Sequence, residues 1–489
     1  MLYCAASAAP GHPLNSRPLR IHFVAIGGTG MAPLACLLQG QGHLVSGSDG
    51  PLYPPMSTLL ETAGIRPLTG FRPENLDPDP DLVIIGNAVP RQNPEAVECE
   101  RRGLPRLSMP EAVARFLLAD RRPLVVAGTH GKTTTTSLAA WVWSFAGRDP
   151  GFLIGGVPSD LGVSFRQGGG ERFLIEGDEY NASYFDREAK FLHYRPETLL
   201  LTSVEHDHAD LYPTPESLLA AYARLVALVP PGGRIVACGD SDDVRAIAAP
   251  AKAPVVLYGE SESCPVRLVG KPESHGAVMR FRLRDESGEE LEVDFPLFGV
   301  HNATNALAVW AAARHDGIEP EVLRAALAGF HGVARRQQQV GEGGGVVVID
   351  DFAHHPTAVE KTLASLRLRF PGRRLVACFE PRSLTAGRGF FEAGYERAFR
   401  DADVVLFAPI FHRDRLAPAD RLDLETLVSK LERAGVRASA LGSIDEVGAR
   451  ALELARGGDV VVTMSSGAFG GLAAKLAAAV GAMVPEGPG

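Results

Sequence analysis

The sequence has few cysteines and no pattern that would pair them. Its 489 residues include six cysteines, which are scattered along the chain without a CxxC pair. A zinc ribbon or a disulfide framework needs such clusters, so neither is expected to be the basis of the fold. This cysteine usage is typical of a reducing compartment, and we expect a cytoplasmic protein.

Long apolar runs and basic stripes are also lacking. No segment approaches the roughly 18 consecutive apolar residues of a membrane-spanning helix, so we expect no membrane partner. Residues 1–18 have no basic stretch ahead of their short apolar run, so a secretory signal is not expected either. The formal net charge of -9, without a basic stripe and interleaved aromatics, argues against a nucleic-acid partner.

What remains is the composition of an ordinary globular protein, 45% hydrophobic and 22% charged. The length allows about three domains of the usual size. Apolar strands, glycine-containing or polar loops and helical patterns alternate in three blocks, which predicts an α/β fold with parallel sheets. We place the domains at residues 19–119, 120–332 and 333–489.

The most informative motif is Gly-Thr-His-Gly-Lys-Thr-Thr, after the apolar run 124–127 and before a helical pattern. A strand, a glycine turn and a helix start place backbone N–H groups and a lysine around a phosphate chain. The motif departs from a strict Walker A because Val126 replaces its first glycine. The residues predicted to bind a nucleotide triphosphate are Gly128, Thr129, His130, Gly131, Lys132, Thr133 and Thr134.

Two clusters of acidic residues and histidines follow strands in the second block, at residues 176–179 and 205–210. The carboxyl ends of parallel strands meet at one edge of a sheet, so both clusters can reach a metal ion beside the γ-phosphate. We predict that Glu176 and His208 bind magnesium together with the Thr133 hydroxyl. The alternative is that these side chains are exposed or only hydrogen-bonded.

The first block begins with a predicted strand at residues 21–26 and a turn formed by Gly27, Gly28, Thr29 and Gly30. Asp49 follows roughly 20 residues later, where a Rossmann unit carries its ribose-binding acid. Taken alone, the pattern indicates either a nicotinamide-dependent oxidoreductase or a tight turn without a ligand.

Taken in order, six motifs resemble those of the ATP-dependent Mur ligases of peptidoglycan assembly. The motifs are residues 128–134, 176–179, 205–212, 301–306, 335–336 and 350–356. The resemblance implies a Rossmann-like N-terminal domain for a UDP-sugar, a P-loop-type central ATPase domain and an α/β C-terminal domain that closes over the site. It also implies that ligation proceeds through an acyl phosphate. The negative charges that come together in this reaction must be stabilised by the enzyme.

The resemblance assigns residues by position. Those implied for the UDP-linked substrate are Gly27, Gly28, Thr29, Gly30 and Asp49. Those implied for ATP besides the phosphate loop are Asn302, Asn305, Arg336, Asp351 and His354. Those implied for catalysis are Lys132, Glu176, His208 and Arg336, with magnesium on Thr133, Glu176 and His208.

Five segments outside these motifs resemble the branch of the family that joins a recycled murein tripeptide, L-alanyl-γ-D-glutamyl-meso-diaminopimelate, to UDP-N-acetylmuramate. They are residues 52–58, 86–88, 153–158, 184–191 and 379–383.

In the last of these segments, Arg382 and Ser383 are predicted to bind the peptide, because a guanidinium matches a carboxylate. The alternative for Arg382 is an ion pair with a neighbouring acid. For the whole chain, the alternatives are the branch that adds L-alanine, a P-loop switch and the oxidoreductase.

Overall fold

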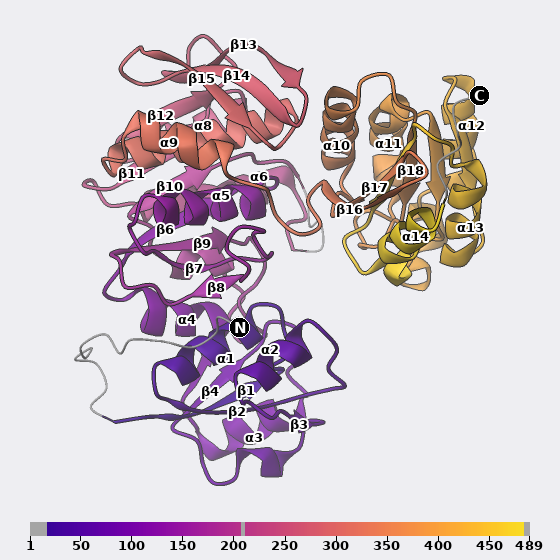
Figure 1. Cartoon of the computed structure of the whole chain (residues 1–489). Helices are drawn as coiled ribbons and strands as arrows, with labels where there is room; N and C mark the ends of the chain where they lie inside the picture. The colour runs from indigo at the N-terminus through magenta and orange to yellow at the C-terminus, as the bar shows by residue number, and fades with distance from the viewer. Residues whose placement is uncertain (1–16, 207–210, 484–489) are drawn as a thin grey trace.

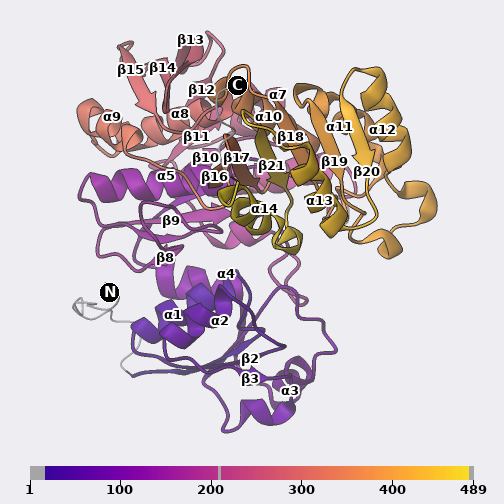
Figure 2. The same ribbon diagram turned by 45° about the vertical axis from the view of Figure 1, so that its right-hand side comes forward.

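The computed structural model describes residues 17–206 and 211–483. It contains three units, each built around one sheet of five, ten or six strands (Figure 1). The central unit lies between the N-terminal and C-terminal units, and the turned view in Figure 2 shows the C-terminal unit against the central one. Alternating helices and mainly parallel strands confirm the predicted α/β class.

The N-terminal unit is a parallel sheet in the order β3-β2-β1-β4-β5. Its strands are β1 (Arg20–Val24), β2 (Leu44–Asp49), β3 (Leu68–Thr69), β4 (Leu82–Ile85) and β5 (Arg106–Ser108). Its helical segments are α1 (Met31–Gly40), α2 (Met56–Thr62), η1 (Pro73–Leu76), α3 (Pro94–Arg102), α4 (Met109–Val113) and η2 (Ala114–Leu118). The first strand ends before the predicted residue 26, because Ala25 turns the chain with a φ of 65°.

The central sheet has the order β15-β14-β13-β12-β11-β10-β6-β9-β7-β8. Its strands are β6 (Arg122–Ala127), β7 (Gly151–Leu153), β8 (Phe165–Arg166), β9 (Arg172–Gly177), β10 (Thr198–Leu201), β11 (Arg234–Cys238), β12 (Val255–Gly259), β13 (Val266–His275), β14 (Val278–Arg284) and β15 (Glu290–Phe295). Its helical segments are α5 (Lys132–Phe145), η3 (Lys190–His193), α6 (Pro215–Ala227), α7 (Asp242–Ala248), α8 (Val300–His315) and α9 (Pro320–Ala328). Because β6 pairs with β9 on one side and β10 on the other, Glu176 of the first acidic cluster and Glu205 of the second flank the phosphate loop.

The C-terminal sheet has the order β16-β17-β21-β18-β19-β20, with only the β16–β17 pair antiparallel. Its strands are β16 (Gln338–Gly343), β17 (Val346–Asp351), β18 (Leu375–Phe379), β19 (Val404–Phe407), β20 (Arg437–Ala440) and β21 (Val460–Met464). Its helical segments are α10 (Pro356–Arg369), η4 (Gly389–Phe391), α11 (Glu392–Ala398), η5 (Phe399–Asp401), η6 (Arg413–Arg415), η7 (Pro418–Asp420), α12 (Leu424–Arg433), α13 (Ile444–Leu454), η8 (Phe469–Gly471) and α14 (Leu472–Gly481). The glycine-rich segment 341–345 closes the β16–β17 hairpin, with its tip at Gly344 and Gly345.

One partly buried aspartate connects three elements of the central unit. Asp316, which caps the C-terminus of α8, accepts hydrogen bonds from Trp143 Nε1 on α5 at 3.0 Å and Arg172 Nε on β9 at 2.7 Å. At their opposite ends, these same elements carry the phosphate loop, the predicted asparagines and Glu176. The anchor therefore fixes the relative positions of three parts of the candidate site.

Among the described residues, no helix combines the length and apolar character needed to cross a bilayer. The cysteines within that part of the chain are free: Cys36, Cys99, Cys238, Cys264 and Cys378.

We expect Asp316→Ala to lower the free energy of unfolding by about 3 kcal/mol, because it leaves the buried Arg172 guanidinium without its closest partner. Urea denaturation followed by tryptophan fluorescence measures this directly, since all three tryptophans lie on α5 and α8 of the central unit. Asp445→Ala, which removes an exposed pair with Lys475, is the control and should change the midpoint little. Equal midpoints for the two variants would contradict the anchoring role.

Candidate active site

The phosphate loop requires glycine at two positions. Gly128 and Gly131 have φ values of 134° and 82°, which side chains disfavour. A Cβ atom on Gly131 would also lie 2.9 Å from the Asn305 amide oxygen. The structure therefore places Asn305 of α8, one of the residues predicted to contact the nucleotide, directly against the loop.

Hydrogen bonds to Ser203 fix one side of the loop, whereas the start of α5 has no side-chain cap from the described residues. Ser203 accepts two hydrogen bonds from it: Thr129 N–H donates to the carbonyl at 2.7 Å, and His130 N–H donates to the hydroxyl at 3.1 Å. Within the described part of the chain, no side chain caps the N-terminus of α5. The first N–H groups of α5, which include those of Thr133 and Thr134, are therefore placed to bind an anion.

Lys132 is held inside the loop by a buried carboxylate. Its Nζ donates to the Gly128 carbonyl at 2.7 Å and to Glu179 Oε2 at 2.9 Å. Burial lowers the pKa of Lys132, but Glu179 and Asp178 outweigh this effect, so the pKa is raised and the ammonium stays charged. Glu179 was not among the predicted site residues, although it lies in the first acidic cluster.

Thr133 and Glu176 form an oxygen-rich pair beside the loop. The Thr133 hydroxyl donates to Glu176 Oε2 at 3.0 Å, and Gly155 N–H donates to Glu176 Oε1 at 2.6 Å. Burial and the nearby Asp178 raise the pKa of Glu176, so a cation bound here would favour its ionised form. Hydroxyl and carboxylate oxygens suit magnesium. The third predicted ligand, His208, lies outside the described residues.

The C-terminal unit contributes Arg336 to this pair. Its guanidinium donates to the Thr133 hydroxyl at 3.4 Å and lies 4.7 Å from the Phe352 ring centre. Burial lowers the pKa of Arg336, while Asp351 and Glu176 oppose that shift. Asp351 accepts hydrogen bonds from two backbone N–H groups, so its carboxylate is fixed near Arg336. Residues distant in the sequence thus converge on the phosphate loop.

Two further residues predicted to bind the nucleotide, Asn302 and His354, make their described contacts away from the phosphate loop. Asn302 is buried one turn before Asn305, and its amide donates to the Phe298 carbonyl at 2.7 Å. His354 packs its ring edge-on against Phe352 and lines a small pocket together with Ser383. The hydrogen bond of Asn302 ends on Phe298, just before α8, and the contacts given for His354 lie within the C-terminal unit.

The predicted peptide-binding residues lie in the loop after β18. Arg382 forms an ion pair with buried Glu380 at 3.5 Å, and its guanidinium stacks 3.9 Å from the Phe411 ring centre. Ser383 accepts a hydrogen bond from Ala386 N–H at 2.9 Å. In this structure Arg382 therefore pairs with a neighbouring acid, which was the alternative predicted for it.

The N-terminal glycine turn lies at the carboxyl end of β1, where β2 and β4 flank it. Gly27 N–H and Gly50 N–H each donate to the Asp49 carboxylate at 2.7 Å, and Gly30 caps α1. Thr29 and Gly28 are exposed. Asp49 therefore braces the turn, and residues 50–69 beside it contribute to a groove of about 500 Å³.

Sequence reasoning also missed a contact between the central and C-terminal units. Glu205 Oε2 lies 3.2 Å from His130 Nε2 and accepts a hydrogen bond from the Thr357 hydroxyl at 2.7 Å. Glu205 belongs to the second acidic cluster, which was the only signal for it in the sequence.

Family models match along most of the chain. Residues 20–121 match the Mur ligase family catalytic domain, residues 126–313 the Mur ligase middle domain, and residues 335–467 the Mur ligase glutamate ligase domain.

Individual relatives match over nearly their whole length. The chain is 39% identical over 462 residues to the UDP-N-acetylmuramate–L-alanyl-γ-D-glutamyl-meso-2,6-diaminoheptandioate ligase of Escherichia coli (strain K12), covering 94% of this chain and 97% of the relative. It is 37% identical over 455 residues to the UDP-N-acetylmuramate–L-alanine ligase of an Anaeromyxobacter species, covering 93% and 96%. The crystal structure of a murein peptide ligase from Psychrobacter arcticus 273-4 superposes with a TM-score of 0.70 at 32% identity, covering 96% of this chain and 100% of that one.

We expect Gly131→Ala to weaken ATP binding at least tenfold, because the new methyl group would displace Asn305 and distort the loop. Gly147→Ala at the other end of α5 is a matched control: its φ is also positive, at 71°, but its Cβ would meet no atom within 4 Å. Both variants pay about 1 kcal/mol of backbone strain. Calorimetric titration with ATP compares them, and equal affinities would contradict the role assigned to the loop geometry.

Proposed function

The chain belongs to the Mur ligase family, and on this premise we propose that it is the ATP-dependent ligase that joins L-alanyl-γ-D-glutamyl-meso-diaminopimelate to UDP-N-acetylmuramate. The observation that carries the ligase assignment is the convergence of Lys132, Thr133, Glu176 and Arg336 around the start of α5. The tripeptide assignment is supported by the 39% identity to the Escherichia coli enzyme of that name. We infer a role in peptidoglycan recycling from the same substrate.

The reaction must overcome the poor reactivity of a carboxylate toward an amine. In the proposed mechanism, a carboxylate oxygen of UDP-N-acetylmuramate attacks the γ-phosphorus of ATP, which releases ADP and leaves an acyl phosphate. The amine of the peptide attacks the activated carbonyl carbon, and the tetrahedral intermediate loses a proton from its nitrogen and expels phosphate to leave the amide. Each step brings anions together, so the enzyme acts mainly by charge stabilisation and positioning.

The side chains around the loop are suited to that task. Lys132 would exchange its contact with Glu179 for phosphate oxygens, and its charge would offset the negative charge that develops during transfer. Bound magnesium, held by Thr133 and Glu176 and in our proposal by His208, would neutralise further phosphate charge. Arg336 would bind the transferring group from the side of the C-terminal unit.

The other two units would hold the substrates. We propose that the turn Gly27–Gly30 and Asp49 bind the UDP-linked sugar, since backbone N–H groups at a helix start favour a diphosphate. Arg382 and Ser383 would bind the peptide at the mouth of the C-terminal unit, where a peptide carboxylate would replace Glu380 as the guanidinium's partner.

The second candidate function is the addition of L-alanine to UDP-N-acetylmuramate, because the Anaeromyxobacter UDP-N-acetylmuramate–L-alanine ligase is 37% identical to this chain. Residues 184–191 and 379–383 favour the tripeptide, because they resemble the tripeptide branch. An oxidoreductase or a P-loop switch would leave the Mur ligase domains matched along residues 20–467 without a role.

We expect Lys132→Ala to fold normally but to lower turnover by about 10² to 10⁴ fold, the range for lost electrostatic contacts to a transition state. Release of ADP in the presence of UDP-N-acetylmuramate and tripeptide measures the rate. Lys475→Ala, an exposed lysine on α14, should retain full turnover. Near-normal turnover of the Lys132 variant would remove this lysine from the mechanism.

We expect the enzyme to consume the tripeptide far faster than L-alanine when both amines are assayed side by side with ATP, magnesium and UDP-N-acetylmuramate. The physical reason is that the tripeptide offers extra carboxylates for Arg382, whereas free alanine has a single carboxylate close to its reacting amine. Preference for L-alanine would overturn the tripeptide assignment and leave the ligase mechanism standing.

The same assay tests Arg382. Arg382→Ala should raise the KM for the tripeptide by about 10-fold or more, the range for a lost hydrogen bond to a charged group, and leave the KM for ATP unchanged. Arg397→Ala, an exposed arginine on α11 of the same unit, is the matched control. A parallel rise in both KM values would indicate that Arg382 only supports the packing of its loop.

A further inference from the structure

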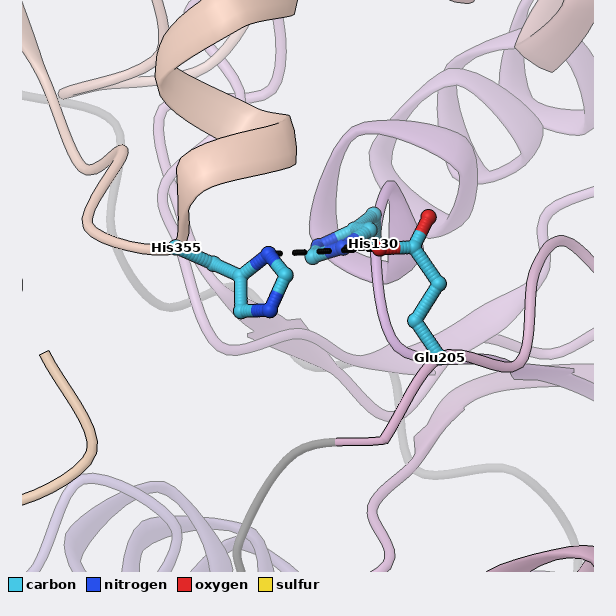
Figure 3. Close-up of side chains that lie close together, drawn as sticks. All are labelled: His130, Glu205 and His355. Carbon is cyan, nitrogen blue, oxygen red and sulfur yellow. Dashed lines mark hydrogen bonds and ion pairs between the residues drawn. The ribbon is translucent and has the colours of Figure 1, made fainter. Parts of the chain in front are cut away.

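Three side chains of types that can bind metal ions meet where the phosphate loop faces the C-terminal unit. His130 comes from the loop, Glu205 follows β10, and His355 precedes α10 (Figure 3). One ligand atom from each residue lies within 4.8 Å of those of the other two. The His130 and His355 ring centres are 4.9 Å apart. The cluster therefore joins two units of the protein, whereas Thr133 and Glu176 lie toward β9 on the other side of β6.

The spacing suits a small transition metal ion. With metal–ligand distances of about 2.0 to 2.2 Å, a tetrahedral zinc site places its ligand atoms roughly 3.4 Å apart. Glu205 Oε2 lies 3.2 Å from His130 Nε2 and 3.9 Å from His355 Nδ1. Two imidazoles and one carboxylate are ligands that zinc accepts, and three protein ligands leave a fourth position open.

The Glu205 carboxylate has the charge and the orientation needed to bind a cation. Burial raises the pKa of Glu205, but the hydrogen bonds from His130 and Thr357 and the charge of Lys361 outweigh it and lower the pKa to about 2. The Thr357 hydroxyl orients Glu205 Oε2 from outside the triad, as outer hydrogen bonds commonly do for metal ligands. Glu205 is therefore ionised and directed at neutral pH.

The two histidines can supply lone pairs without rebuilding the site. A metal ion would replace the proton that His130 Nε2 shares with Glu205, and that proton can move to Nδ1 of the same ring. His355 Nδ1 accepts a hydrogen bond of 3.3 Å from Thr357 N–H, and a metal–nitrogen bond would take its place. Binding would therefore exchange these two hydrogen bonds for three metal–ligand bonds.

We propose that His130, Glu205 and His355 bind a divalent transition metal ion of the zinc class, at a site distinct from the magnesium site. The bound ion links the phosphate loop to the start of α10 and so holds the C-terminal unit against the central unit. Magnesium is a poor occupant, because it prefers oxygen ligands in octahedral geometry.

The test uses the full chain freed of metal by a chelator. Zinc is titrated against a chromophoric competitor in millimolar magnesium, which occupies the Thr133–Glu176 site. We expect one tightly bound zinc ion, a rise in the midpoint of thermal unfolding with zinc, and the intense visible absorption of tetrahedral cobalt when Co²⁺ replaces it. His355→Ala and Glu205→Gln should each weaken zinc binding at least tenfold, since even outer-shell changes cost that much.

Two control variants distinguish this site from other zinc-binding positions. Glu176→Gln alters the magnesium site and should keep the zinc affinity. His331→Ala removes an exposed histidine that pairs with Asp160 and should keep it too. The proposal is overturned if the wild type binds no zinc under these conditions, or if His355→Ala binds zinc as tightly as the wild type. Circular dichroism checks that each variant is folded, and His130→Ala replaces any variant that is not.

Discussion

The crowding of charge at the N-terminus of α5 is the constraint on which the rest of the structure depends. Lys132 and Arg336 are cations in largely buried positions, and each is matched by carboxylates, Glu179 for the lysine and Asp351 with Glu176 for the arginine. Such groups are costly to bury unless they are paired. Binding of a triphosphate would exchange these internal partners for phosphate oxygens, so the resting pairs hold the cations in place for the reaction.

This arrangement explains why the site is shared between units. The central sheet provides the loop and Glu176, because the carboxyl ends of β6 and β9 meet at one edge. No strand of that sheet carries Arg336, which comes from the segment leading into the C-terminal sheet. Asp316 holds the far ends of α5, α8 and β9 together, so the central part stays ordered while the C-terminal unit completes the site.

The parts of this site that have a local sequence pattern could be predicted from the sequence. The phosphate loop and the cluster containing Glu176 could be predicted, because a glycine turn and a strand end each have a local signature. The partners of Lys132 and His130 could not be predicted, because Glu179 and Glu205 reach them only through the pairing of β6 with β9 and β10. The early end of β1 at Val24 was missed because Ala25, unlike glycine, gives no signal of a positive φ.

The central claim is that this site transfers a phosphoryl group to a carboxylate before the amide forms. The most direct test starts from UDP-N-acetylmuramate labelled with ¹⁸O in its carboxylate and follows one turnover by mass spectrometry of the released phosphate. An acyl phosphate predicts that one labelled oxygen appears in inorganic phosphate, because the carboxylate oxygen leaves with it. Unlabelled phosphate, or label found in AMP, would contradict the mechanism.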